Sequence, residues 1–210
     1  MSISASGPGT GGRVQRVDAR ANRSRILDVA EDVFGQGGAS ASTEEVARLA
    51  GVGIATVFRH FPTKAALLEA VLVRRFDRLR ERAETMLTAA DPGRAFADFF
   101  SYLVADAATK IAITEALLDA GGDRDGAAGP ASDGLRRAVG ALLRHAQLAG
   151  AVRSDVELPE VYALLVGTSQ AAARAHLDEQ ARSRLLAIVG YGLAPRPDQP
   201  AQAPTSAAHR

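Results

Sequence analysis

The sequence predicts an all-α protein, and two observations, its composition and the spacing of its apolar residues, support this fold class. Apolar residues make up 47% of the 210 residues but aromatic residues only 5%, a composition rich in Ala and Leu that favours helix packing over a sheet sandwich. Apolar residues recur at helical spacing along most of the chain, and strand-like alternation bounded by hairpin turns is not seen. The chain contains no cysteine, which excludes a disulfide framework and cysteine-bound metal sites. We therefore expect a helical core that forms without cross-links.

Three short helices are expected near the N-terminus. An apolar stripe predicts the first over residues 26–34, where a run of glycines follows. Ser42 and Glu45 form a capping box, in which the serine hydroxyl accepts from an amide of the first turn, and they begin a second helix. Gly51 ends it, and residues 54–60 form a third. A short helix, a tight turn and another short helix are typical of a helix-turn-helix, which places its second helix in the DNA major groove.

Longer helices are expected after this motif. A fourth helix, from an N-cap at Thr63 to about Ala89, is long enough to link two modules. The later apolar pattern predicts a flexible loop over residues 121–131 and helices over residues 92–107, 110–119, 132–149, 158–176 and 178–192. Gly and Ser at the start and four prolines near the end predict disordered termini. The predicted organisation is a disordered Arg-containing arm (1–20), a three-helix helix-turn-helix DNA-binding domain (21–68), a helical ligand-binding and dimerisation domain (69–193) and a disordered tail (194–210).

The charge is distributed unevenly along the chain. The 25 Lys and Arg residues nearly balance the 24 Asp and Glu residues, but residues 1–80 hold 12 of the basic and only 8 of the acidic ones. Much of this surplus lies in the first 25 residues. Two interpretations of the arginine-rich arm remain open: it contacts DNA in the minor groove or at phosphates, or it is a plain disordered tail.

The helix-turn-helix region also carries a specific resemblance. The residues concerned are Arg25 to Ala30, Phe34, Gly38, Thr43, Val46-Ala47, Ala50-Gly51-Val52, Thr56 to Lys64, and Leu67-Leu68. Together they resemble the N-terminal domain of the tetracycline-repressor-like (TetR) family of transcriptional regulators, over residues 22–75. The resemblance implies a dimeric, ligand-responsive repressor that binds an operator. The rest of the chain resembles the family's variable half only in length and helix number.

The resemblance assigns DNA-facing positions residue by residue. Arg23 is added from the charged arm, and the candidate DNA-binding residues are Arg23, Thr43, Thr56, Phe58, Arg59, His60 and Lys64, the last as a phosphate contact. The family usually has tyrosine at the position of Phe58, so here that contact is apolar. Gly53 and Ile54 replace a residue that is often polar, which shifts base reading toward Thr56, Arg59 and His60. Two hydrogen bonds from Arg59 to a guanine are worth roughly 1–3 kcal/mol of base discrimination.

An excess of apolar and aromatic residues predicts a ligand pocket in the C-terminal half. The candidate walls and polar groups are Phe99, Tyr102, Leu103, Leu117, Leu142, His145, Tyr162 and Gln170. Close packing of these rings into a core without any ligand remains an alternative. Lys110 is the only lysine after residue 64, so we expect a mostly apolar, neutral or cationic effector. We expect this effector to release DNA by tilting the fourth helix.

The last two predicted helices combine apolar and small residues, a pattern that favours close helix packing between two chains. The apolar members are Val161, Leu164, Leu165, Leu185, Leu186 and Val189. An isologous four-helix interface would match the two-fold symmetry of a palindromic operator.

The sequence offers no nucleophile and base in a catalytic arrangement and no Gly-rich phosphate loop, so we expect neither an enzyme nor a bound cofactor or metal. No run of eighteen apolar residues and no secretory signal is found, so we expect a cytoplasmic protein without membrane contact. The leading hypothesis is a ligand-responsive homodimeric repressor of operator DNA. A DNA-binding regulator without small-molecule control and, less favoured, a helical enzyme are the alternatives.

Overall fold

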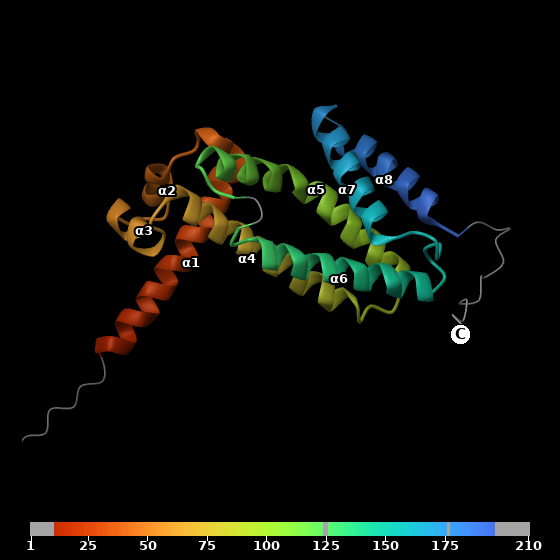
Figure 1. Ribbon diagram of the computed structural model, residues 1–210, viewed down its shortest axis with the longest axis horizontal. Coiled ribbons are helices and arrows are strands. Elements are labelled where there is room, and N and C mark those ends of the chain that lie inside the picture. The colour runs from red at the N-terminus through yellow and green to blue at the C-terminus, as the bar shows by residue number, and fades with distance from the viewer. Residues whose placement is uncertain (1–10, 124–125, 176, 196–210) are drawn as a thin grey trace, which may run out of the picture. The chain divides into compact units, whose positions relative to one another are not determined.

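The computed structural model describes residues 11–123, 126–175 and 177–195 (Figure 1). Every regular element in these ranges is a helix, which confirms the predicted all-α class. In chain order they are α1 Gly11–Gly37, the 3-10 helix η1 Gly38–Ser40, α2 Thr43–Leu49, α3 Ile54–His60, α4 Lys64–Met86, α5 Pro92–Asp119, α6 Gly129–Leu148, α7 Leu158–Arg174 and α8 Glu179–Leu193. None of them is both long and apolar enough to cross a membrane.

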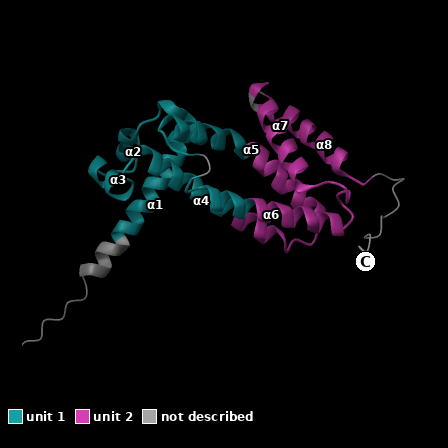
Figure 2. Cartoon of the chain, viewed as in Figure 1, with its two compact units in different colours: residues 1–79, 106–135 teal, residues 80–105, 136–210 magenta. Residues whose placement is uncertain are grey.

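The chain forms two compact units (Figure 2). Unit 1 comprises residues 1–79 and 106–135, and unit 2 comprises residues 80–105 and 136–210. Each unit is built from two separate stretches of chain, whereas each predicted domain is one continuous stretch. The difference arises because α4, α5 and α6 are long and each contributes residues to both units.

The local signals in the helix-turn-helix act as the sequence predicts. Ser42 is the N-cap of α2, and its hydroxyl accepts a 3.1 Å hydrogen bond from the amide of Glu45. Gly51 has φ +65°, a left-handed conformation that glycine adopts without steric cost, and it turns the chain between α2 and α3. Helix α3 spans Ile54–His60, the range predicted for it.

The structure differs from the prediction in two longer elements. Helix α1 begins at Gly11, inside the arm expected to be disordered, because residues 13–25 are mostly Arg, Ala and other residues compatible with helix and extend a helix already formed downstream. Helix α5 is continuous where two helices were expected, since no Gly or Pro interrupts residues 94–119. The apolar residues of α5 belong to two different units, since residues up to 105 pack in unit 2 and later ones in unit 1. This change of packing partner explains why the sequence pattern predicted two helices. Residues 1–10 and 196–210 of the expected disordered ends lie outside the described residues.

Unit 1 has a closely packed apolar core that holds the helix-turn-helix. Its fully buried side chains are Ile26, Leu27 and Phe34 of α1, Val46 of α2, Val57 of α3, Leu67, Leu68 and Val71 of α4, and Ile113 and Leu117 of α5. Helices α1 and α5 approach closely at Gly35, where a Cβ atom would lie 2.6 Å from Cγ2 of Thr109. A larger residue at this position would therefore force the side chain of Thr109 or one of the two helices to shift.

A buried network of charges also joins three helices of unit 1. Arg75 of α4 is buried and donates to the carboxylate of Glu31 on α1, and also to both the carboxylate and the backbone carbonyl of Asp106 on α5. Arg78 donates to Glu31 as well. An ion pair of 2.7 Å links Arg74 Nη2 to Asp28 Oδ1.

The two carboxylates in this network have opposite pKa shifts. Burial alone would raise the pKa of Glu31, but the hydrogen bonds and charges of Arg78 and Arg75 outweigh it and hold the pKa below its ordinary 4.5. Burial raises the pKa of Asp106 above its ordinary 3.8, although the charge of Arg75 opposes this. Glu31 is thus the carboxylate whose charge the network favours.

Candidate DNA-binding surface and ligand pocket

Helix α3 is fixed in unit 1 by one face and exposes the other. Val57 is fully buried, and Phe61, directly after the helix, is buried too. Gly53 precedes the helix with open space around it, so the backbone can approach another molecule closely at this end. The geometry suits a short helix that inserts its outer face into a groove.

Four of the predicted DNA-binding residues lie on α3. Arg59 and Phe58 are exposed, whereas Thr56 and His60 are half-buried. The rings of His60 and Phe61 lie 6.2 Å apart. The structure therefore brings these four residues together on one helix and leaves Arg59 the freest polar side chain among them.

Thr43 and Lys64 have partners inside the protein. Thr43, only 7% exposed, donates its hydroxyl to Oε2 of Glu44 at 3.3 Å. The ammonium of Lys64 donates to the carbonyls of Ala39 and Ala41, at 3.1 and 2.9 Å, and lies 5.3 Å from the ring centre of Phe34. Lys64 therefore holds the segment that leads into α2, whereas the bond of Thr43 stays within α2.

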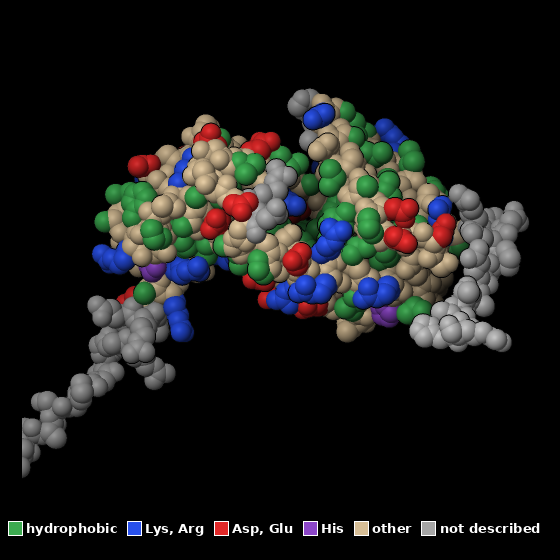
Figure 3. Space-filling model, viewed as in Figure 1, with side chains coloured by type: hydrophobic (Ala, Val, Ile, Leu, Met, Phe, Trp, Pro, Cys, Tyr) green, Lys and Arg blue, Asp and Glu red, His purple; other side chains and the backbone are tan. Residues whose placement is uncertain are grey.

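Arg23 lies on the part of α1 that extends before the apolar stripe. Its guanidinium is 5.1 Å from the ring centre of Phe61, a cation–π distance that places an exposed arginine beside the end of α3. Arg20 is exposed one turn earlier. In Figure 3, Lys and Arg side chains and a histidine gather on this part of unit 1. Sequence reasoning found the basic arm but missed that residues 11–25 continue α1.

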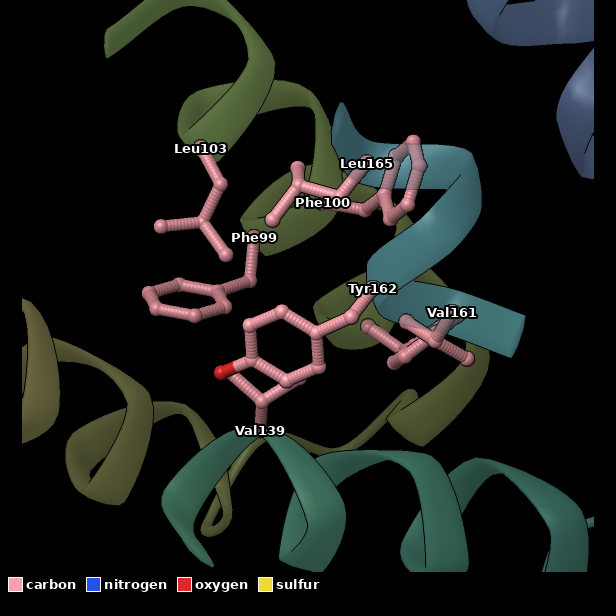
Figure 4. A pocket seen from close by; sticks show the side chains of 8 residues that line it. Phe99, Phe100, Leu103, Val139, Val161, Tyr162 and Leu165 are labelled. Carbon is pink, nitrogen blue, oxygen red and sulfur yellow. The ribbon is translucent and has the colours of Figure 1, made fainter. Parts of the chain in front are cut away.

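A small cavity lies in unit 2 (Figure 4). Its volume is about 10 Å³, and its lining comes from α5 (Phe96, Phe99, Phe100 and Leu103), α6 (Val139) and α7 (Val161, Tyr162 and Leu165). Figure 4 shows the ring of Tyr162 between Phe99 and Val139. Burial raises the pKa of Tyr162 to about 12, and the charge of Arg136, whose guanidinium is 4.8 Å from the ring centre, opposes this. Tyr162 is therefore neutral near pH 7, with a hydroxyl that can donate or accept.

The predicted pocket residues divide into three that line this cavity and five that lie elsewhere. Phe99, Leu103 and Tyr162 line it. Leu142 is buried in unit 2, Leu117 is buried in unit 1, His145 is half-buried on α6, Gln170 is exposed on α7, and Tyr102 is exposed with Arg82 4.2 Å from its ring centre.

Phe96 and Phe100 share the helical stripe of Phe99 and Leu103 and belong to the excess of aromatic residues that predicted the pocket, although they were not named among its candidate walls. Their spacing of three and four residues places them on one face of α5 and was the available signal. Val161 and Leu165 were assigned to the dimer interface, whereas the structure has both lining the cavity.

Helices α7 and α8 expose apolar side chains in unit 2. The exposed large ones are Leu164 and Val166 on α7 and Ile188 and Tyr191 on α8, with Ile188 66% exposed. Gly167, Gly190 and Gly192 have open space around them. Of the residues predicted for the dimer interface, Leu164 is exposed and Leu185, Leu186 and Val189 are half-buried.

Comparisons with known proteins agree with this geometry. The family described as "Bacterial regulatory proteins, tetR family" matches residues 26–71, and the domain described as "Transcriptional regulator SbtR-like, C-terminal domain" matches residues 91–195. The crystal structure of a TetR transcription regulatory protein from Mycobacterium vanbaalenii is 38% identical, with a TM-score of 0.71 and coverage of 86% of this chain and 99% of that one. A TetR transcriptional regulator from Streptomyces coelicolor is 33% identical, with a TM-score of 0.70 and coverage of 82% and 98%.

A further match concerns the HTH-type transcriptional regulator SAR0097 of Staphylococcus aureus. The two sequences are 32% identical over 77 residues, which is 36% of this chain. The match spans 40% of the length of that curated relative.

The helix-turn-helix of α2 and α3, together with the family match over residues 26–71, defines a DNA-binding transcriptional regulator. More particularly, the chain belongs to the TetR family of transcriptional regulators and has an SbtR-like C-terminal domain.

Proposed function

We propose that this protein is a ligand-responsive repressor that binds a palindromic operator as a homodimer and is released by a small, mostly apolar molecule. The observation that carries the proposal is the cavity around Tyr162, in a chain whose helix α3 exposes Arg59 on its outer face. One part of the molecule offers a surface for DNA and another offers a site for an effector.

The DNA contacts we propose divide into base readers and backbone contacts. Arg59, helped by Thr56 and His60, reads bases from α3, because it is exposed and can donate two hydrogen bonds to a guanine. Arg23 and Arg20 contact phosphates, since both are exposed on α1 and Arg23 lies beside the end of α3. Lys64 and Thr43 support this surface through the start of α2.

The homodimer we propose forms through α7 and α8. Their exposed apolar side chains lie near glycines with open space, which lets two helices approach closely. Two copies of this helix pair make an isologous interface whose two-fold axis matches that of the operator.

The effector site must enlarge to hold a ligand. A cavity of about 10 Å³ has room for about one water molecule, whereas small-molecule pockets usually measure roughly 300–1,000 Å³. The effector therefore favours a conformation in which the side chains around Tyr162 have moved apart, and it gains affinity only for that conformation. Helix α5 runs without a break from Phe99 in unit 2 to Asp106 in unit 1, so a change in the pocket wall has a continuous path to the network at Arg75.

The lining of the cavity suggests the class of effector. Its walls are apolar apart from the neutral hydroxyl of Tyr162, which favours an uncharged apolar molecule with one hydrogen-bonding group. The small volume of the same cavity favours the second candidate function, a TetR-family regulator without small-molecule control.

One set of measurements tests the proposal and separates the two candidates. Operator duplexes are selected from random DNA with the purified full-length protein, and a thermal-shift screen of small apolar compounds then identifies ligands. In the ligand-responsive case the compound weakens operator binding, and the operator weakens compound binding by the same factor. A promoter fusion must lose expression when the protein is present and regain it with the compound. A compound that binds without changing operator affinity would falsify effector control.

A further inference from the structure

Two large apolar side chains are exposed side by side on α3. Ile54 is 36% exposed and Phe58 is 42% exposed. They are four residues apart, which places them on one side of the helix, one turn from each other. At the end of unit 1 that carries α2 and α3, apolar side chains reach the surface close to Lys and Arg (Figure 3).

The core of unit 1 does not account for this pair. Val57 and Phe61 already fill the buried side of α3. Ile54 is the first residue of the helix, a position where a β-branched side chain gives no helix-forming advantage. Single exposed apolar residues are common, but here two lie together on the outer face of the helix that carries Arg59.

The major groove offers one apolar group on its base edges, the C5-methyl of thymine. The residues at the N-terminal end of a recognition helix are those that contact base edges, and Ile54 and Ala55 stand there with Phe58 one turn later. The small Gly53 and Ala55 beside Ile54 leave room for this approach.

We infer that Ile54 and Phe58 contact thymine methyl groups in each operator half-site, so that the operator carries thymine at two defined positions. The inference rests on the proposed binding of operator DNA and goes beyond it by assigning bases to apolar residues. Arg59 then reads a guanine by hydrogen bonds, and Ile54 and Phe58 read thymines by methyl burial. Discrimination of thymine from cytosine at these positions needs no polar side chain.

Deoxyuridine tests the inference, because it pairs as thymine does and lacks only the methyl group. The full-length protein is titrated with the selected operator and with duplexes that carry deoxyuridine at single thymines of both half-sites. Each methyl group contacted is expected to contribute about fourfold in affinity, the factor that corresponds to burial of one methylene-sized group. Deoxyuridine at thymines outside the half-sites is the DNA control.

Variants assign the effect to residues. In Ile54→Ala, the affinity is expected to become insensitive to deoxyuridine at one of the two thymine positions. In Phe58→Ala it is expected to become insensitive at the other position, because each variant lacks the side chain that contacts that methyl group. Phe58→Tyr keeps the ring and is expected to keep the sensitivity. Leu49→Ala is the matched control, because Leu49 is 51% exposed but lies on α2, and its sensitivity should equal that of the wild type. Thermal unfolding and binding to random DNA verify that each variant is folded.

The outcomes are distinct. Equal affinity for thymine and deoxyuridine operators overturns the inference and leaves operator binding intact, as does a sensitivity that both alanine variants retain. Selected operators without thymine in the half-sites also overturn it. If no sequence is selected at all, the proposed operator binding itself fails. If Ile54→Ala and Phe58→Ala instead change only the oligomeric state, the pair faces a second copy of the chain and not DNA.

Discussion

Units 1 and 2 bury their side chains to different degrees. Of the twelve largest fully buried side chains among the described residues, only Phe99 and Leu142 belong to unit 2. Unit 1 also buries a charged network centred on Arg75. Unit 2 has a cavity partly lined by Tyr162. Both units expose apolar side chains, on α3 in unit 1 and along α7 and α8 in unit 2.

This difference between units 1 and 2 fits the functions that we propose for them, DNA binding and effector binding. A surface that reads base edges must be held to within about half an ångström, which a closely packed core and locked side chains provide. A site that opens around a ligand has to come from a less tightly packed region, because only such a region can change conformation at low free-energy cost. The contrast teaches that packing, more than residue type, separates the unit that we propose to read DNA from the unit that we propose to bind an effector.

The largest expected effect comes from breaking the network of unit 1. Arg75→Met is expected to lower the free energy of unfolding by about 3–5 kcal/mol, because it leaves the buried Glu31 and the half-buried Asp106 without Arg75 as their partner. Urea denaturation measures the change. Arg94→Ala is the control, since Arg94 forms only an exposed pair with Asp98 in unit 2 and should change stability by less than about 0.5 kcal/mol. Equal losses in the two variants would show that the network adds nothing to unit 1.

The opposite pKa shifts of the two carboxylates sharpen this test. The pKa of Glu31 is lowered, so its stabilisation is present above about pH 4.5 and is lost as the pH falls through the folded-state pKa. The pKa of Asp106 is raised, so its ionisation opposes folding above its folded-state pKa, and stability is regained as the pH falls. Relative to the wild type, Glu31→Gln should therefore recover stability on acidification, and Asp106→Asn should lose it. Urea denaturation at about pH 7 and about pH 4 measures both trends, and parallel trends would contradict the assignment.

The exposed face of unit 2 gives the next largest effect. Val166→Glu combined with Ile188→Glu places charges on the proposed dimer face without touching a buried side chain. We expect a monomer by sedimentation and a loss of operator affinity of at least about 100-fold, since two linked half-site contacts become one. Leu148→Glu is the control, because Leu148 is 86% exposed and lies on α6 rather than on α7 or α8. A dimer that survives the double substitution would place the interface elsewhere.

The helix-turn-helix of unit 1 could be predicted from the sequence better than the cavity of unit 2. The capping hydroxyl of Ser42 and the glycine turn at Gly51 are local signals, and local signals determine short helices. The burial of Thr43 and the carbonyl partners of Lys64 could not be predicted, because they depend on how η1 and α2 pack together.

The pocket depends on packing even more strongly. A helical stripe indicates which residues of α5 face inward, but it does not indicate which neighbour they meet. Leu117 has the same apolar character as Leu103 and lies in the other unit. Leu165 and Val161 were predicted to face a second chain for the same reason, since an apolar side chain fits a pocket wall and a dimer interface equally well.

Two substitutions are expected to distinguish contacts with bases from contacts with the DNA backbone. Arg59→Ala is expected to relax preference at one base pair of each half-site and to cost about 1–3 kcal/mol on the selected operator. Arg23→Ala should weaken binding to all sequences alike and make the salt dependence shallower by about one, since Arg23 is one of the proposed phosphate contacts. Fluorescence anisotropy on operator variants at several salt concentrations measures both. Equal losses for Arg59→Ala on every operator variant would make Arg59 a backbone contact.

The smallest expected effect distinguishes an effector pocket from a merely loose core. Tyr162→Phe removes only the hydroxyl of a half-buried side chain, so operator affinity should not change, and its cost to folding should be small. If the hydroxyl bonds the effector, effector affinity should fall by about 0.5–1.5 kcal/mol, or roughly three- to tenfold, as for the loss of one neutral hydrogen bond. Calorimetric titration of the compound found by thermal shift gives this value. Leu148→Ala is the control, because Leu148 is 86% exposed on another helix of unit 2, α6, and does not line the cavity. Two results together would place the effector site outside this cavity: unchanged effector affinity in Tyr162→Phe, and a loss of effector affinity in a variant outside unit 2. The proposed contrast between a closely packed DNA-binding unit and a more adaptable effector-binding unit would then fail.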